Sequence, residues 1–252
     1  MTRKSTPYEP SKTILDYSSP IEYVKNVLDS KSPEYKGGYE TDGHVLLSSR
    51  YSNLKDKKQK RLIAEAIVLL LDDPDYLYDA IPVASELGLE EAKEWFLKLS
   101  KKPLNEIRQI NTSNYVNGFI CLINYASKHE SFLPFLRNYV SNIGLTISEL
   151  SIVLYNLSEV DPDFILKDVD KYLTNLLLIK EKEKDKLTCI AFLTSGIFKK
   201  YGDGYCVDLA KRFKENLPKE YQVLFYKALE QNPTPRFKPY LNELKKILGI
   251  TD

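Results

Sequence analysis

The chain has 252 residues, of which 43% are hydrophobic and 28% charged, and its formal net charge is +1. This length suffices for a sizeable core, either as one domain or as one continuous array. The near-neutral charge argues against a dedicated nucleic-acid binder. Mean hydropathy is −0.34 and no apolar run approaches about 20 residues, which predicts no transmembrane helix. Met1 to Ser19 lack the apolar centre of a secretory signal, so we expect a cytoplasmic protein without a membrane partner.

The first 54 residues are expected to form an irregular N-terminal segment with one helix. Apolar residues between Ile14 and Leu28 predict that helix. The stretch 33–52 is rich in glycine and tyrosine, which favours either an extended loop or a small hairpin that turns at Gly37-Gly38. Residues 55–252 are then expected to form one helical domain.

The strongest pattern of the chain lies between Leu70 and Leu99. Two apolar segments flank an Asp-Pro turn at residues 72–75, and a second short turn follows at Leu87-Gly88. The pattern predicts two antiparallel helices. The side chains expected to be buried in this hairpin are Leu70, Leu71, Ala80, Leu87 and Phe96. Trp95, the single tryptophan, is expected on or beside the buried stripe, with an interface role as the alternative.

Apolar side chains recur at helical spacing through the rest of the chain. The stripes cover residues 61–71, 115–126, 150–157, 187–198, 221–229 and 240–248. Thr146 to Glu149 resembles a capping box, and Pro162 falls where a first helical turn tolerates proline. Asp73-Pro74-Asp75 returns as Asp161-Pro162-Asp163, an offset of 88 residues. Two periods of 44 residues fit the range of about 40–47 that helical repeats show.

Residues 62–100 resemble a HEAT repeat. Helix, Asp-Pro turn and second helix follow in the family's order, with Ala80 and Gly88 at positions of close packing. Tyr78-Asp79 stands where the family usually has a basic residue. The resemblance implies an all-α fold in which antiparallel hairpins stack as a short right-handed α-solenoid. It also implies a scaffold that binds proteins, since HEAT-like arrays mostly do so and a few act as enzymes on DNA.

No residue pattern predicts a catalytic, cofactor-binding or metal site. The three cysteines Cys121, Cys189 and Cys206 form no Cys-x-x-Cys pair and are expected as buried, reduced thiols. His44 and His129 stand far apart, without ligand spacing for zinc. A Cys121–His129 pair on one helix would be more than two turns apart and too far to hydrogen-bond.

Acidic residues concentrate in the predicted hairpin. Residues 61–100 carry three basic and nine acidic side chains, a net charge of −6. Capping of the second helix explains the carboxylates of the turn, and a site for a cation or a basic partner is the alternative. The candidate partner-binding residues are Asp72, Asp75, Asp79, Glu86 and Asp168. Asp79 and Glu86 are seven residues apart, hence on one helix face, and Asp168 would come from a later unit.

These observations favour a non-enzymatic helical-repeat protein that binds another protein, as a monomer or weak homo-oligomer. A bacterial immunity-type inhibitor or a small adaptor would suit such a chain. The alternative is a HEAT-like DNA glycosylase, which would need a basic concave groove; the net charge of +1 counts against it. An enzyme whose catalytic residues are scattered along the helices is a third interpretation. The basic stretch Lys199 to Lys214 would suit an acidic partner or nucleic acid.

Overall fold

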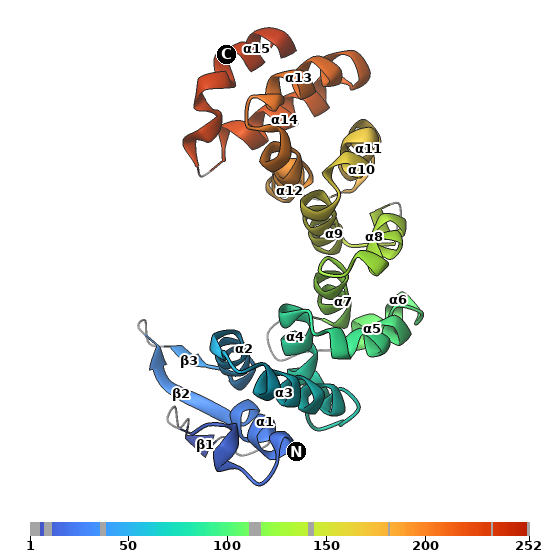
Figure 1. Ribbon diagram of the computed structural model, residues 1–252. Helices are drawn as coiled ribbons and strands as arrows, with labels where there is room; N and C mark the ends of the chain where they lie inside the picture. The colour runs from blue at the N-terminus through green and yellow to red at the C-terminus, as the bar shows by residue number, and fades with distance from the viewer. Residues whose placement is uncertain are drawn as a thin grey trace. The chain divides into compact units, whose positions relative to one another are not determined.

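The computed structural model describes residues 6–7, 12–35, 39–110, 117–140, 144–180, 182–232 and 234–250 (Figure 1). This part of the chain is almost entirely helical, as the sequence predicts, with short strands near the N-terminus. None of its helices combines the length and apolar character needed to cross a membrane. The expected turn at Gly37-Gly38 and the expected helix start at Tyr115 lie outside the described residues.

Two compact units make up the chain, residues 1–129 and 130–252. The helices of the first unit are α1 (Pro20–Leu28), α2 (Gly43–Asn53), α3 (Lys57–Leu70), α4 (Leu77–Leu87), α5 (Lys93–Leu99), α6 (Leu104–Gln109) and α7 (Gly118–Ala126). Those of the second are α8 (Leu133–Val140), α9 (Ile147–Val160), α10 (Pro162–Lys167), α11 (Val169–Leu178), α12 (Glu183–Tyr201), α13 (Tyr205–Asn216), α14 (Lys219–Glu230) and α15 (Leu241–Leu248). We expected a division after residue 54, but α1 packs on α3 and α2 packs on α4, so this segment shares the core of the first unit.

The expected helix from Ile14 to Leu28 is interrupted. A single 3-10 turn covers Ile14–Asp16, and α1 begins only at Pro20. The Ser19 side chain accepts a hydrogen bond from the backbone N–H of Glu22, which is the bond of a helix N-cap. Proline fits the next position because a first-turn N–H has no partner inside the helix. Ser19 and Pro20 therefore start a new helix within the apolar stretch.

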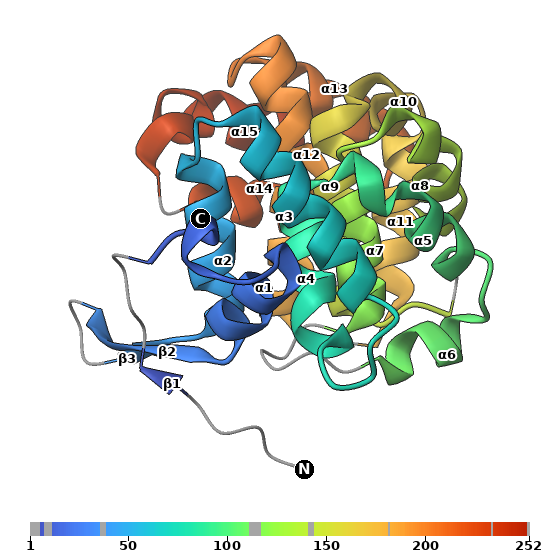
Figure 2. The same cartoon turned by 60° about the horizontal axis from the view of Figure 1, so that its bottom comes forward.

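A small sheet accompanies the first helices (Figure 2). Strand β1 (Thr6–Pro7) pairs in parallel with β2 (Ser30–Tyr35), with Thr6 opposite Ser30. Strand β2 pairs antiparallel with β3 (Tyr39–Thr41), with Tyr35 opposite Tyr39. Of the two interpretations of residues 33–52, the paired strands agree with the hairpin, but only up to Thr41. The prediction is wrong for the rest of the stretch, because α2 begins at Gly43 and gives the first 54 residues a second helix.

The hairpin predicted between Leu70 and Leu99 is present. Helix α3 ends at Leu70, the Asp-Pro turn follows, and α4 ends at Gly88, whose φ of +60° is the left-handed conformation that glycine adopts most readily. The predicted core residues Leu70, Leu71, Ala80 and Phe96 are buried. Leu87 is only half-buried, so this prediction is wrong: α4 ends there, and Leu89 beyond the turn takes the buried position instead.

In each unit, one pair of helices that are not consecutive in the chain lies side by side and runs in the same direction. In the first unit, the Ser85 hydroxyl of α4 donates to the carbonyl of Cys121, and Tyr125 of α7 donates to the carbonyl of Leu89. From the first bond to the second, the residue number rises by four on both sides, from Ser85 to Leu89 and from Cys121 to Tyr125. Helices α4 and α7 therefore run parallel.

The same arrangement recurs in the second unit between α9 and α12. The side chains of Ser151 and Cys189 meet at 2.8 Å, and the Ser158 hydroxyl donates to the carbonyl of Phe192. The sequence-predicted capping box is confirmed at the start of α9, where Thr146 and Glu149 exchange hydrogen bonds. Pro162 occupies the first turn of α10, also as predicted.

Several hydrogen bonds between helices that are not consecutive share one range of sequence separation. Those that join α1 to the Asp-Pro turn, α2 to α4, α4 to α7, α9 to α12, α11 to α13 and α12 to α14 span 34 to 48 residues. These bonds thus join helices that are close, but not adjacent, in the chain.

Candidate functional site

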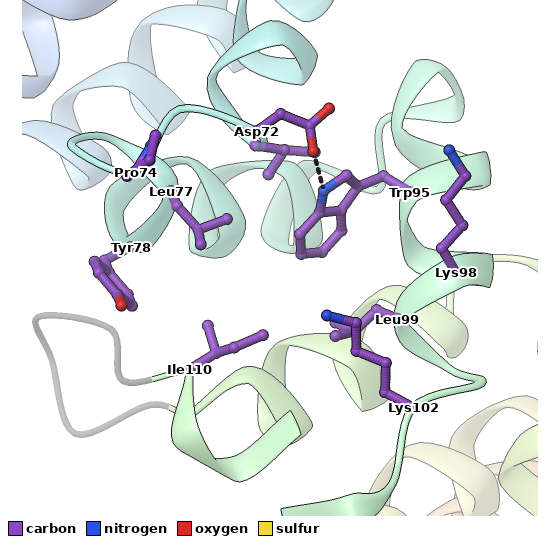
Figure 3. Close-up of a pocket in the computed structure, with 10 residues that line it drawn as sticks. Asp72, Pro74, Leu77, Tyr78, Trp95, Lys98, Leu99, Lys102 and Ile110 are labelled. Atoms are coloured by element: carbon purple, nitrogen blue, oxygen red, sulfur yellow. Dashed lines mark hydrogen bonds between the residues drawn. The ribbon is translucent and has the colours of Figure 1, made fainter. Parts of the chain in front are cut away.

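A pocket of about 450 Å³ opens beside the Asp-Pro turn in the first unit (Figure 3). Most of its lining is apolar. The lining residues are Leu71, Asp72, Pro74, Leu77, Tyr78, Trp95, Lys98, Leu99, Lys102 and Ile110. They come from the turn and the start of α4, from α5, and from the residues that follow α5 and α6. We call this site the Trp95 pocket.

The Asp-Pro turn that forms one wall is held from two sides. The Asp73 carboxylate accepts a hydrogen bond from the backbone N–H of Asp75 at 3.0 Å and pairs with the ammonium of Lys25 at 2.9 Å. The Tyr76 hydroxyl donates to the carboxylate of Asp29 at 2.9 Å. Because Lys25 and Asp29 belong to the end of α1, a neighbouring hairpin fixes the wall of the pocket.

We expected a turn carboxylate at the N-cap position of α4, but Tyr76 occupies that position, and its side chain forms no capping hydrogen bond. The carboxylate of Asp73 stabilises the turn itself instead. In the echo of this motif the prediction holds, since the Asp161 side chain caps α10 through the N–H of Phe164. Asp161 also forms an ion pair with Arg137 of α8.

Trp95 forms the opposite wall and is half-buried. Its indole Nε1 donates a hydrogen bond to Oδ1 of Asp72 at 3.1 Å, so the pocket has one polar clasp between its walls. We expected Trp95 on or beside the buried stripe of its helix. Phe96 and Leu99 are the residues of α5 that are buried there, and Trp95 is rotated about 100° from Phe96 on the helix. This rotation leaves the indole at the surface.

A row of aromatic rings supports the indole from behind. The Trp95 ring meets Phe96 edge-on, with centroids 5.2 Å apart, and Phe96 stacks on Tyr125 at 3.9 Å. Tyr125 in turn stacks on His129, whose Nδ1 lies 3.2 Å from a carboxylate oxygen of Glu90. Stacked and edge-on pairs of this kind stabilise packing beyond the area they bury. The indole therefore rests on a rigid base.

The remaining rim of the pocket is basic. Lys98 of α5 and Lys102, just after this helix, are both exposed. Figure 3 shows the side chain of Lys102 pointing toward the middle of the pocket, between Trp95 and Ile110. Sequence reasoning missed Lys98, Lys102 and Ile110. The one available signal was Tyr78, which departs from the repeat pattern and is 44% exposed at the pocket.

The structure brings together some of the predicted partner-binding residues. Asp72 lines the pocket, and Asp75 is exposed in the same turn. On α4, Asp79 is half-buried, and the carboxylate of Glu86 accepts a hydrogen bond from the Ser48 hydroxyl of α2. Asp168 belongs to the second unit, between α10 and α11. Of the predicted residues, Asp72 therefore belongs to the Trp95 pocket and Asp75 to the turn beside it.

Outside the Trp95 pocket, the three cysteine side chains are part of the packed core. The predicted burial of Cys121, Cys189 and Cys206 is confirmed, and all three are free thiols. Burial raises the pKa of Cys121 to about 12. Helix α7 ends before His129, which lies past its last turn. In the described part of the chain, no group of three or more His, Cys, Asp or Glu side chains is arranged to hold a metal ion.

Comparison of the chain with protein-family models, with curated proteins and with solved structures gives no match. The function is therefore argued from the chemistry of the Trp95 pocket.

Proposed function

We propose that this chain is a non-enzymatic helical protein that binds a segment of a partner protein in the Trp95 pocket. One observation carries the proposal: a half-exposed tryptophan, hydrogen-bonded to Asp72, forms a wall of this largely apolar pocket. Its volume of about 450 Å³ falls within the range of about 300–1,000 Å³ typical of ligand pockets. Tryptophan and tyrosine are the residues that most often dominate binding energy at protein interfaces.

Preorganisation of the walls supports this role. The indole is held by its hydrogen bond and by the ring of Phe96, while the opposite wall is tied to α1 through Lys25. A partner that inserts an apolar side chain then has few receptor side chains to immobilise. Binding to fixed walls retains more of the interaction energy as affinity than binding to mobile ones.

The proposal includes a repeat architecture, in which hairpins stack within each unit as a short right-handed α-solenoid of the HEAT-like kind. It is supported by the parallel pairs α4/α7 and α9/α12, and by hydrogen bonds between hairpins that span 34 to 48 residues. In a solenoid each repeat contacts mainly its neighbours. Repeats of about 40–47 residues would place contacts at such separations.

A cytoplasmic adaptor or immunity-type inhibitor is the setting that we propose. The support is chemical, because the three cysteines are buried as free thiols, which suits a reducing compartment. The carboxylates on the acidic side of the pocket would then affect the rate at which the partner associates. Asp72 and Asp75 place two carboxylates at one edge of the pocket, and exposed charges of this kind accelerate the association of an oppositely charged partner.

Peptide display tests the proposal with defined probes. A library of random peptides is selected on the folded protein, and selected peptides are labelled for anisotropy titrations. We expect Trp95→Ala and Tyr78→Ala each to weaken binding by about 30-fold, the effect of losing an interface hot spot. Tyr155→Ala is the matched control: Tyr155 is 43% exposed, as Tyr78 is 44% exposed, but it lies on α9 of the second unit.

Two outcomes decide the matter. Peptides that bind the Trp95→Ala and Tyr78→Ala variants as tightly as the wild type would refute the proposal. For peptides with basic residues, Asp75→Lys should slow association several-fold at low salt and have little effect at high salt, because a Debye length of about 3 Å at 1 M salt screens exposed charges. Unchanged association at low salt would remove the acidic edge from the proposal.

A further inference from the structure

The charged groups on the two sides of the Trp95 pocket differ in whether they already interact with another group of the protein. On the turn side, the carboxylate of Asp72 already accepts the hydrogen bond of the indole. On the α5 side, neither Lys98 nor Lys102 forms an ion pair with another described residue. Lys93 of the same helix shows the contrast, since its ammonium pairs with Glu90 at 3.0 Å. The pocket thus presents two uncompensated ammonium groups beside its apolar interior.

We propose that the pocket selects a partner segment in which an apolar side chain is followed or preceded closely by a carboxylate. The apolar side chain would occupy the space between Trp95, Tyr78 and Ile110. The carboxylate would then lie against Lys98 and Lys102. This inference rests on the proposed function and adds the chemistry of the bound segment to it.

The position of the lysines makes this pairing specific. Figure 3 shows Lys102 reaching toward the middle of the pocket, whereas Lys98 lies beyond the indole and its side chain points away from the pocket interior. A carboxylate on this side would meet the ammonium of Lys102 first, and the exposed Lys98 side chain adds a second positive charge on α5. On the turn side the same group would meet the carboxylates of Asp72 and Asp75, and like charges in proximity are unfavourable. The charge pattern therefore orients the segment as well as attracting it.

A protein segment is the occupant to which the geometry points. Lysine ammonium groups are flexible point charges, suited to an exposed carboxylate that needs no planar recognition. The acidic edge at Asp75 favours, in addition, a basic side chain on the far side of the apolar anchor. A polypeptide supplies an anion, an apolar group and a cation in one short stretch.

Parallel selection of one random peptide library on three proteins tests the inference. The proteins are the wild type, the variant Lys98→Glu with Lys102→Glu, and the control Lys180→Glu with Lys184→Glu. The control pair is also exposed and four residues apart, and lies in the second unit, so both variants change net charge equally. We expect the wild type and the control to enrich Asp or Glu within two positions of an apolar residue. The pocket variant should enrich Lys or Arg there.

Titration of a single selected peptide gives the second measurement. Replacing its acidic residue by glutamine should weaken binding to the wild type about fivefold, as an exposed ion pair allows, and leave binding to the variant Lys98→Gln with Lys102→Gln unchanged. Equal affinity of the acidic and neutral peptides for the wild type would overturn the inference, as would identical enrichment on the wild type and the pocket variant.

The two proposals fail in different ways. If peptide binding survives Trp95→Ala, the pocket is not the binding site and the proposed function falls. If binding requires Trp95 but ignores the lysines, only the chemistry of the segment is wrong. Light scattering covers the remaining occupant: a dimer of the wild type that Trp95→Ala converts to monomer would assign the pocket to a second copy of the chain and overturn the inference.

Discussion

Gly196 of α12 packs directly against the backbone of Ser158 in α9. A Cβ atom placed on Gly196 would lie 1.7 Å from the carbonyl oxygen of Ser158, and the backbone N–H of Gly196 lies 3.4 Å from the hydroxyl of the same serine. No side chain can be accommodated at that distance without separating the helices. The contact between α9 and α12 is the most extensive in the second unit, and it depends on the absence of a side chain at Gly196.

Gly196→Ala should therefore destabilise the protein by more than about 2 kcal/mol, because overpacking against backbone cannot be relieved by a side-chain rotation. Gly204→Ala is the control, since its Cβ would meet Tyr240 at 3.4 Å, an ordinary contact. Urea unfolding measures both variants. Equal stability of the two would show that α9 and α12 do not approach as closely as described.

The core of the predicted hairpin allows a second test. Ala80 is fully buried on α4, so Ala80→Glu would place an unpaired carboxylate among apolar side chains and lower the free energy of unfolding by more than about 3 kcal/mol. Leu69→Glu on α3 is expected to be tolerated, because Leu69 is 65% exposed. Thermal unfolding that ranks the two variants the other way would contradict the hairpin packing.

The bond between Trp95 and Asp72 can be followed by fluorescence, because the chain has one tryptophan. Asp72→Ala removes the acceptor of the indole N–H and should increase quenching of Trp95 emission by acrylamide. Asp72→Asn keeps an acceptor oxygen and should behave as the wild type. The free energy of unfolding should change by about 1 kcal/mol or less, as for a single partly exposed hydrogen bond. Equal quenching of all three proteins would exclude the clasp.

The buried thiols predict how stability depends on pH. Burial raises the pKa of Cys121 and Cys206 to about 12 and that of Cys189 to about 11, above the ordinary value of 9.0. The folded chain holds these protons where the unfolded chain has released them. The contribution to stability is therefore complete below about pH 9 and is lost as pH rises toward 12, by at most about 1.4 kcal/mol per pH unit per thiol. Urea unfolding between pH 8 and 10.5 checks the slope, and Cys121→Ala should reduce it.

Much of the fold could be predicted because its signals are local. The Asp-Pro turn and the capping box of Thr146 and Glu149 depend on residues within one helical turn of each other. The error at Leu87 shows the limit of such signals. Periodicity identifies the apolar face of a helix, but Gly88 determines where α4 ends and hence whether Leu87 remains on that face.

The Trp95 pocket could not be predicted from the sequence, because local signals do not show which distant residues come together. Its walls come from three stretches of chain, and the position of Ile110 depends on how the chain continues after α6. The sequence shows that acidic residues are concentrated in this hairpin, but each of these residues has a different role. Asp73 holds the turn, while Asp72 clasps the indole, and only three-dimensional neighbours distinguish the two.

The short span of the bonds between hairpins has a consequence for biosynthesis. The partners described above are 34 to 48 residues apart, so each helix meets its neighbour soon after it leaves the ribosome. At about 5–20 residues per second, that delay is a few seconds. Such bonds can thus form while the chain is still being synthesised, and the chain can acquire its structure progressively from the N-terminus.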